Sequence, residues 1–216
     1  MSNPKLVIFD CDGVMFDSKN ANLHFYNHIR TKFGHPPMDD EELEYVHMHH
    51  VMDSVSHIFR HWPEDVKKAH SYRKSLDYKD FIQHMTMEPD LVEFLEYISP
   101  NCKTAISTNR TTTMSTLLDL FGLRKYFGLV VTAMDVENSK PHPDAILKIL
   151  SHFALNVEEC IFIGDSMVDR QHADSVGMRM IAFKNPQLPA DYHVSSFMEI
   201  TRLPLFLNGR HSPEQN

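Results

Sequence analysis

Leu-Val-Ile-Phe-Asp-Cys-Asp-Gly, residues 6–13, is the stretch that decides how this chain folds. Four consecutive apolar residues indicate a strand covered on both faces, because a strand with one solvated face would alternate apolar and polar residues. Asp10 and Asp12 follow directly, and Gly13 permits a tight backbone turn. The segment alone also fits a polar turn that only ends a strand, so its meaning depends on the rest of the chain.

Four further apolar runs resemble this first strand. They are Thr104–Ser107, Leu129–Thr132, Cys160–Ile163 and Met180–Phe183. Helical patterns lie between them: Asp90 is placed to cap one helix, and Gly122 to end another over Thr111–Phe121. Strands that alternate with helices predict an α/β fold with a parallel sheet.

Residues 17–86 break this alternation, because they contain helical patterns and no convincing strand. Ser18 can cap a helix with Leu23, Tyr26 and Ile29 on one face, and Gly34 can stop it. We therefore expect an all-helical insertion over residues 17–86 and an α/β core over residues 1–16 and 87–207. The polar residues 208–216 are expected to form a disordered tail.

The composition excludes several classes of protein. A formal net charge of -8 argues against a nucleic-acid partner, because phosphate backbones recruit clustered Lys and Arg. The cysteines Cys11, Cys102 and Cys160 are odd in number and scattered along the chain. This pattern indicates a protein of a reducing compartment and argues against a disulfide framework. The chain has no apolar run of about 18 residues and no signal-peptide pattern, so we expect a cytoplasmic protein without a membrane partner.

Paired carboxylates after a strand can divide the work of a hydrolysis. An aspartate can attack phosphorus to give an aspartyl-phosphate, while a second one acts as acid toward the leaving oxygen and then as base toward water. Asp10 and Asp12 are the candidates for these two tasks.

Three other polar segments follow predicted strands, where the ligand crevice of an open α/β sheet lies. Thr108-Asn109-Arg110 can cradle a phosphate, although Ser and Thr are also routine helix caps. Lys140 stands on a proline-bounded loop and can neutralise phosphoryl oxygens, although loop lysines are commonly solvated.

The last of these segments is Gly164-Asp165-Ser166-Met167-Val168-Asp169. Two aspartates four residues apart lie on one side of an incipient helix, and carboxylate oxygens suit Mg²⁺. Asp165 and Asp169 could also be ordinary acidic residues at a helix N-terminus.

Taken in order, the four segments resemble the motifs of the haloacid dehalogenase (HAD) superfamily of hydrolases. Its first motif is Asp-x-Asp-Gly, here Asp10–Gly13, and its second is a Ser or Thr that ends a strand, here Thr108. The third is a lysine commonly followed by proline, here Lys140, and the fourth is Gly-Asp-x-x-x-Asp, here Gly164–Asp169. The resemblance implies a Rossmann-like core with an inserted helical cap.

The resemblance also implies roles for these residues. Asp10 would be the nucleophile and Asp12 the acid and base, while Thr108 and Lys140 would bind the phosphoryl group with Gly13, Asn109 and Arg110 beside them. Mg²⁺ would be held by the Asp10 carboxylate, the Asp12 main-chain carbonyl and Asp165, with Asp169 in or next to its ligand set. The expected partner is a small phosphorylated metabolite, bound by a monomer or homodimer.

Within the superfamily, Asp-Gly-Val-x-x-Asp-Ser at residues 12–18 resembles phosphoglycolate phosphatase-like and β-phosphoglucomutase-like proteins. The cap loop of the mutases carries a glycine and an arginine, and the corresponding stretch Tyr45–Val51 has neither. A phosphatase is therefore the main hypothesis. A sugar-phosphate mutase and a catalytically silent phosphate-binding regulatory module are the alternatives.

The insertion is rich in histidine, which leaves three interpretations open. Its histidines are His24, His28, His35, His47, His49, His50, His57, His61, His70 and His84. His47, His49 or His50 could contact substrate, and His57 with His61 could bind a transition metal from one helix face. Ordinary solvated or capping histidines are the third interpretation.

Overall fold

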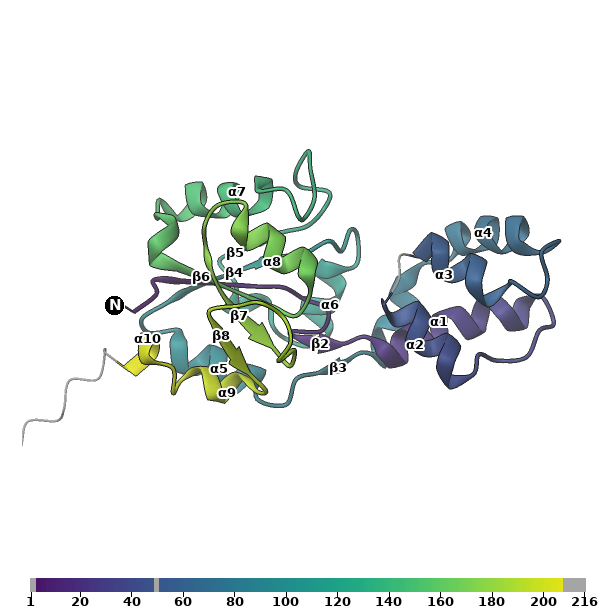
Figure 1. The fold of residues 1–216 in the computed structure, drawn as a ribbon, viewed down its shortest axis with the longest axis horizontal. Coiled ribbons are helices and arrows are strands. Elements are labelled where there is room, and N and C mark those ends of the chain that lie inside the picture. The colour runs from purple at the N-terminus through teal and green to yellow at the C-terminus, as the bar shows by residue number, and fades with distance from the viewer. Residues whose placement is uncertain (1–2, 49–50, 208–216) are drawn as a thin grey trace, which may run out of the picture. The chain divides into compact units, whose positions relative to one another are not determined.

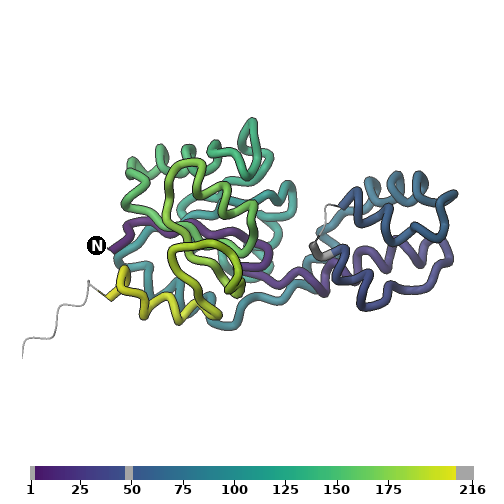
Figure 2. The backbone as a smooth tube through the Cα atoms, in the orientation of Figure 1, coloured from purple at the N-terminus to yellow at the C-terminus, as the bar shows by residue number. Residues whose placement is uncertain are grey.

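The computed structural model describes residues 3–48 and 51–207, and the chain divides into two compact units. Unit 1 comprises Met1–Phe16 and Met87–Asn216, and unit 2 comprises Asp17–Thr86. The tail expected over residues 208–216 lies outside the described residues. Figure 2 follows the chain from the purple N-terminal strand of unit 1, through unit 2, and back into unit 1.

A six-stranded parallel sheet forms the centre of unit 1, with the strand order β5-β4-β1-β6-β7-β8. Its strands are β1 (Leu6–Phe9), β4 (Lys103–Ser107), β5 (Leu129–Val131), β6 (Cys160–Gly164), β7 (Arg179–Phe183) and β8 (Tyr192–Val194). The predicted α/β fold is confirmed, and all five predicted strands are present. The sequence pattern missed β8, because only Val194 of its three residues is buried.

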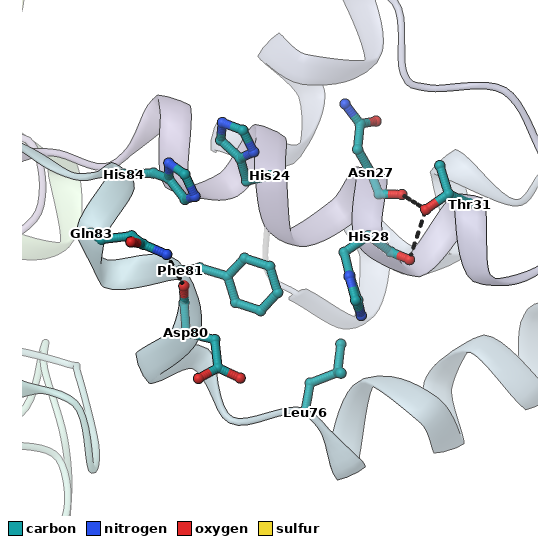
Figure 3. A pocket seen from close by; sticks show the side chains of 9 residues that line it. All are labelled: His24, Asn27, His28, Thr31, Leu76, Asp80, Phe81, Gln83 and His84. Atoms are coloured by element: carbon teal, nitrogen blue, oxygen red, sulfur yellow. Dashed lines mark hydrogen bonds between the residues drawn. The ribbon is translucent and has the colours of Figure 1, made fainter.

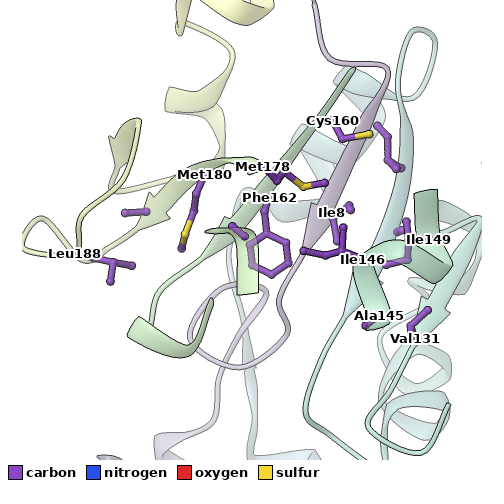
Figure 4. Packing of buried hydrophobic residues seen from close by; sticks show 14 residues of the cluster. Ile8, Val131, Ala145, Ile146, Ile149, Cys160, Phe162, Met178, Met180 and Leu188 are labelled. Atoms are coloured by element: carbon purple, nitrogen blue, oxygen red, sulfur yellow. The ribbon is translucent and has the colours of Figure 1, made fainter. Parts of the chain in front are cut away.

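Helices cover both faces of this sheet (Figure 1). One face packs against α7 (Asp144–Phe153) and α8 (Met167–Asp174), where Ile8 joins a cluster with Ile146 and Phe162 (Figure 4). The next residue, Phe9, packs on the other face, with its ring 6.2 Å from that of Phe94 in α5 (Leu91–Ile98). Successive strand residues point to opposite faces, so a strand buried on both sides needs an unbroken apolar run.

The remaining elements of unit 1 connect these layers. They are α6 (Met114–Leu120), α9 (Phe197–Ile200), α10 (Pro204–Leu207) and the 3₁₀ turns Arg124–Tyr126 and Val157–Glu159. Helix α6 begins three residues later than predicted, because the carbonyl of Arg110 accepts a hydrogen bond from the N–H of Ala133 at 3.0 Å and holds the segment as a loop. Asp90 precedes α5 as expected, but its carboxylate accepts from the N–H of Met198 at 2.8 Å and does not cap the helix.

Unit 2 contains helices around its own apolar core. They are α1 (Lys19–Lys32), α2 (Asp40–Met48), α3 (Val51–Ile58), α4 (Val66–Ser75) and the 3₁₀ segment Tyr78–His84. The core gathers Phe25, Ile29 and Phe59 among other residues. Ser18 precedes α1 without capping it, since Asp17 accepts from the N–H of Lys19 at 2.8 Å instead. Two short strands, β2 (Phe16–Asp17) and β3 (Thr86–Met87), form a separate sheet where the chain passes between the units.

Across the part of the chain that the structure describes, every helix is too short or too polar to cross a lipid bilayer.

Candidate active site

Four segments that are far apart in the sequence meet at the carboxyl end of the sheet. Asp10 follows β1, Thr108 follows β4, Asp165 follows β6, and Lys140 lies in the loop between β5 and α7. The chain runs outward from β1 to β5 on one side and from β6 to β8 on the other, so the strand order reverses beside β1. In open α/β sheets, such a reversal leaves a crevice in which ligands bind.

Lys140 is the centre of the polar contacts in this crevice. Its Nζ donates to Oδ1 of Asp10 at 2.5 Å and to Oδ1 of Asp169 at 2.7 Å, and the residue is only 6% exposed. Burial by itself lowers the pKa of Lys140, but the two carboxylates outweigh burial and raise it. The lysine therefore remains a cation inside the protein.

Asp10, Asp165 and Asp169 form an acidic cluster whose ligand oxygens lie within 4.8 Å of one another. Burial raises the pKa of Asp10 to about 8 and that of Asp165 to about 7, and the neighbouring Asp169 adds to both shifts while Lys140 opposes them. Three carboxylates thus face one ammonium group. Crowded carboxyl oxygens are hard donors, and a divalent cation such as Mg²⁺ that displaces their protons would relieve their mutual repulsion, so the residues fit this ion.

Asp169 is also part of the beginning of α8. Its Oδ2 accepts from the hydroxyl of Ser166 at 2.7 Å, while the hydroxyl oxygen of Ser166 accepts from the N–H of Asp169 at 3.2 Å. This capping box satisfies backbone donors that an N-terminal helical turn leaves free. We predicted that Asp165 and Asp169 lie on one side of a helix. Asp165 instead precedes α8, although its carboxylate lies in the same cluster as that of Asp169.

Gly13 makes the close approach between the first and fourth motifs possible. Its φ is +77°, and a Cβ there would lie 2.1 Å from Oδ2 of Asp165. Gly13 was predicted to lie beside the phosphoryl group, and its N–H donates to the carbonyl of Phe16 at 2.8 Å. Gly13 therefore contributes space for Asp165.

Asp12 is held by Arg110 in a two-point ion pair. Nε of Arg110 donates to Oδ2 of Asp12 at 2.7 Å, and a terminal guanidinium nitrogen donates to Oδ1 at 2.6 Å. The sequence placed both residues near the phosphoryl group but gave no sign of this contact.

Thr108 and Asn109, the other residues of the second motif, contact Arg110 and the lysine loop. Oγ1 of Thr108 accepts from the N–H of Arg110 at 3.1 Å, so its own hydroxyl hydrogen can point elsewhere. Asn109, a predicted phosphate ligand, donates its side-chain amide to the carbonyl of Lys140 at 3.2 Å. Asn109 thus ties the second motif to the lysine loop.

Two supporting residues were missed by the sequence reasoning. His172 of α8 is fully buried, and its Nε2 lies 3.0 Å from Oγ of Ser107 at the end of β4. Asn185 donates to the carbonyl of Asp165 at 2.8 Å. Asn185 follows β7, so the rule that polar residues after strands gather at one edge would have found it; nothing local marks His172.

The histidines of unit 2 give no comparable cluster among the described residues. His49 and His50 lie outside those residues, and His47 is described only as backbone in α2. His57 stacks on Tyr45 with a ring separation of 3.6 Å, which favours a packing role for it.

A pocket of about 460 Å³ opens within unit 2 (Figure 3). It is lined by His24, Asn27, His28, Thr31, Leu76, Asp80, Phe81, Gln83 and His84. The rings of His24 and His84 stack at 3.7 Å on one side of it. None of the predicted site residues whose side chains the structure describes lines this pocket.

The family model described as haloacid dehalogenase-like hydrolase matches residues 7–183 of the chain. A curated protein from Caldanaerobacter subterraneus, assigned as a pyrophosphatase, is 26% identical over 208 residues, which cover 91% of this chain and 93% of that protein. The phosphoglycolate phosphatase of Escherichia coli is 37% identical over 71 residues, which cover 32% of this chain and 28% of that enzyme.

Solved structures give the same result for the fold. The crystal structure of a HAD-superfamily hydrolase of subfamily IA from Geobacter sulfurreducens has a TM-score of 0.86 at 38% identity, covering 94% of this chain and 99% of that one. A haloacid dehalogenase-like hydrolase from Streptococcus pneumoniae has a TM-score of 0.77 at 20% identity, covering 92% and 97%. At that lower identity the likeness concerns the fold alone.

Proposed function

The chain belongs to the family of haloacid dehalogenase-like hydrolases, and from this premise we propose that it is a Mg²⁺-dependent phosphatase that acts through an aspartyl-phosphate. The prediction that the chain is an enzyme of the phosphatase type is confirmed at the level of the family. The matching curated proteins are named pyrophosphatase and phosphoglycolate phosphatase. The contact that carries the finer proposal is the one between Lys140 and Asp10 inside the acidic cluster. It puts a cation beside the carboxylate that would attack phosphorus.

Asp10 is the proposed nucleophile. Lys140 donates to Oδ1 of Asp10, which leaves Oδ2 to attack phosphorus. The new bond between Oδ2 and phosphorus forms as the bond between phosphorus and the leaving oxygen breaks. Asp12 gives a proton to that leaving oxygen. Asp12 then takes a proton from a water molecule that attacks the phosphorus of the aspartyl-phosphate, which releases phosphate and restores Asp10.

Lys140 and Thr108 are the proposed ligands of the transferred phosphoryl group. The ammonium of Lys140 balances charge on the phosphoryl oxygens, and the hydroxyl of Thr108 donates to one of them. Both groups are buried, with exposures of 6% and 4%, so their dipoles and charges act in a medium with little water. Positioning and charge neutralisation would supply most of the rate, as in other phosphoryl transfers.

Mg²⁺ would be held by Asp10, Asp165 and the main-chain carbonyl of Asp12, with Asp169 adjoining. When bound, it supplies positive charge next to the phosphoryl oxygens and the crowded carboxylates. Asp169 is engaged by Lys140 and by the start of α8, so we propose that it orients the lysine and the helix. Asn185 would hold Asp165 in place through its carbonyl.

The partner is proposed to be a small phosphorylated metabolite, and the names of the relatives make phosphoglycolate and pyrophosphate the first compounds to test. A cytoplasmic location is proposed because Cys11, Cys102 and Cys160 are all free and buried, which suits a reducing compartment. A monomer or homodimer remains the expectation for the assembly.

Phosphate release from an aryl phosphate, sugar phosphates, nucleotides, phosphoglycolate and pyrophosphate, with and without Mg²⁺, tests the proposal. We expect metal-dependent turnover that Asp10→Asn lowers by about a thousandfold or more. Acid-quenched wild-type enzyme should carry phosphate on the peptide that contains Asp10. Asp119→Asn is the matched control, because Asp119 is an exposed aspartate paired with Arg124 outside the site.

Three outcomes would contradict the proposal. Isomerised sugar phosphate without released phosphate would favour the mutase. Binding of phosphate without turnover on any compound would favour the silent regulatory module. Full activity of Asp10→Asn would remove the proposed nucleophile.

A further inference from the structure

His172 is a buried side chain that the proposed mechanism does not use. It lies in the last turn of α8, it is fully buried, and its Nε2 lies 3.0 Å from Oγ of Ser107. Ser107 is the last residue of β4, and Thr108, a proposed ligand of the phosphoryl group, follows it directly. The imidazole thus contacts the sheet one residue before the second motif.

The same ring faces the loop that carries Lys140. Burial, and after it the charge of Lys140, lowers the pKa of His172 to about 4. The backbone carbonyls of His142 and Pro141 act in the opposite direction, as carbonyls do when a ring N–H points at them. These two residues follow Lys140 in the chain. One imidazole therefore lies between the end of β4 and the lysine loop.

Phe162 of β6 gives a second contact between His172 and the lysine. The ring centroids of His172 and Phe162 are 5.6 Å apart, and the two rings are nearly perpendicular at 85°. Nζ of Lys140 lies over the ring of Phe162, 5.5 Å from its centroid, where the face of an aromatic ring attracts a cation. His172 and the ammonium of Lys140 thus pack on the same aromatic side chain.

The surroundings of His172 decide which ring nitrogen carries its hydrogen. A neutral imidazole has one N–H and one acceptor nitrogen, and a carbonyl can only accept. Nε2 faces the hydroxyl of Ser107, which can donate, so Nδ1 is left to donate toward the carbonyls of the lysine loop. Nδ1 is buried, and no atom of the described residues makes a hydrogen bond of normal geometry with it. Because an unpaired buried donor is costly, its N–H attracts these carbonyls and the loop with them.

We propose that His172 is a positioning residue of the phosphoryl site, which holds the lysine loop toward the end of β4 and so sets the separation of Lys140 and Thr108. This inference rests on the proposed phosphatase function, in which both residues bind one phosphoryl group. Two ligands from separate segments bind one group well only while their spacing is kept. The amide of Asn109 also ties β4 to this loop, so the loss of His172 shifts the lysine without releasing it.

Two amide substitutions each keep one half of the imidazole. In His172→Asn the amide nitrogen falls near the position of Nδ1 and can donate toward the loop. In His172→Gln the longer side chain places its amide near the position of Nε2, beside Ser107, and leaves the loop without a donor. We expect His172→Gln to lower kcat/KM by about tenfold, mainly through kcat, because misplaced phosphoryl ligands weaken transition-state binding. His172→Asn should stay within about threefold of wild type.

Inhibition by orthovanadate separates positioning from a loss of stability. Vanadate takes up the five-coordinate geometry of a transferred phosphoryl group, so its affinity depends on Lys140 and Thr108 together. Its inhibition constant should rise by about tenfold in His172→Gln and by much less in His172→Asn. His193→Gln is the matched control, because Nε2 of His193 contacts the carbonyl of Leu188 at 2.7 Å in β8, at the edge of the sheet. This control should leave kcat and vanadate inhibition unchanged.

The outcomes separate this inference from the proposed function. Unchanged kcat and vanadate inhibition in a folded His172→Gln would overturn the inference and leave the phosphatase intact. Equal losses in both amide variants would also contradict it, because the donor toward the loop would then make no difference. No turnover of any phosphate ester by wild-type enzyme would instead overturn the proposed function.

The wild-type protein supplies a test that needs no variant. Nitrogen chemical shifts of ¹⁵N-labelled histidine distinguish the two neutral tautomers, and we expect His172 in the Nδ1–H form at neutral pH. A thermal melt establishes whether the variants fold. If neither amide variant folds, the tautomer decides, since an Nε2–H form of His172 would rule out the donor toward the loop.

Discussion

Single side chains decide how charge is balanced in this site. Lys140 contacts two of the three clustered carboxylates, and Arg110 neutralises Asp12. Among the described residues, no basic side chain forms an ion pair with the carboxylate of Asp165. Burial makes each remaining negative charge costly, which is why the pKa of Asp165 is raised. The charge left over is what a divalent cation would balance, and this gives Asp165 its proposed role as a ligand.

Gly13→Ala tests the close approach to Asp165. An alanine at a φ of +77° costs roughly 1–2 kcal/mol in backbone strain. Its Cβ would lie 2.1 Å from Oδ2 of Asp165, so the Asp165 carboxylate would have to move. We expect a loss of stability and a drop of about tenfold or more in apparent Mg²⁺ affinity, measured by titrating activity with the ion. Gly34→Ala is the control, because Gly34 has the same φ and open space around its Cβ position. Equal Mg²⁺ affinity in both variants would contradict the contact.

His172 should make stability depend on pH. Burial, followed by the charge of Lys140, lowers its pKa from 6.5 to about 4. The folded state therefore binds fewer protons here than the unfolded state, so the contribution of His172 is complete above pH 6.5 and is lost as pH falls toward 4. A shift of this size corresponds to about 3 kcal/mol.

The measurement is the free energy of unfolding of wild-type protein and His172→Gln between pH 7 and pH 4. The wild type should lose more stability than the variant across this range, so the difference between them narrows or reverses at low pH. A difference that stays constant with pH would mean that the imidazole does not change protonation between the folded and unfolded states.

At the scale of elements, the site is built where strands end and helices begin. The capping box of Ser166 and Asp169 starts α8, and the same Asp169 receives Lys140 from the loop before α7. Asn109 ties the end of β4 to that loop, and His172 ties α8 to β4 through Ser107. The last three of these contacts join elements from different parts of the chain, and two of them hold α8, at its start through Lys140 and in its last turn through Ser107.

Ser166→Ala tests whether the helix start positions the catalytic groups. Removing the cap should cost about 1 kcal/mol and should also lower kcat/KM by about tenfold, because Asp169 loses a partner and Lys140 loses its fixed anchor. Asn156→Ala is the control, since Asn156 and Glu159 form a second capping box away from the site. It should cost similar stability with unchanged kcat/KM. If both variants lose activity alike, the effect is one of stability alone.

At the scale of the whole molecule, two units with separate apolar cores share one chain. The cluster around Phe162 belongs to unit 1 and that around Phe59 to unit 2. The acidic cluster lies entirely in unit 1, whereas Trp62, the only tryptophan, lies in unit 2 and stacks on His35 at 4.0 Å. Tryptophan fluorescence therefore reports on the unit that does not contain the proposed ion.

Mg²⁺ should stabilise unit 1 in a manner that depends on pH. In the absence of the ion, the raised pKa values of Asp10, about 8, and Asp165, about 7, mean that the folded state binds protons that the unfolded state does not. Their contribution to stability therefore rises as pH falls, and Mg²⁺ has to displace those protons. A saturating ion should raise Tm by roughly 5–10 °C at pH 8 and by less at pH 6.

Circular dichroism detects this shift, and Trp62 fluorescence provides an internal comparison. If the two cores unfold separately, circular dichroism should show two transitions, and the ion should move only the one that Trp62 fluorescence does not follow. A larger shift at pH 6 than at pH 8 would contradict the assignment of Asp10 and Asp165 as groups that must lose protons.

Much of the fold could be read from local patterns. The five apolar runs were found because strands of a covered parallel sheet need unbroken apolar residues, and the rule on strand ends then brought Asp10, Thr108, Lys140 and Asp165 together. The expected insertion and unit 2 share the bounds 17–86. Contacts that join distant residues through side chains alone, such as those of His172 and Arg110, leave no local pattern and could not be foreseen.

The two carboxylates in Asp-Cys-Asp-Gly, residues 10–13, show the division most clearly. The sequence by itself determined that they follow a buried strand, because apolar periodicity and turn chemistry are local properties of the chain. Only the tertiary structure decided their partners: Asp10 contacts Lys140, which is 130 residues away, and Asp12 contacts Arg110, which is 98 residues away. Protonation and hydrogen bonding depend on charges a few ångströms away in space, and the folded sheet brings those charges together from across the chain.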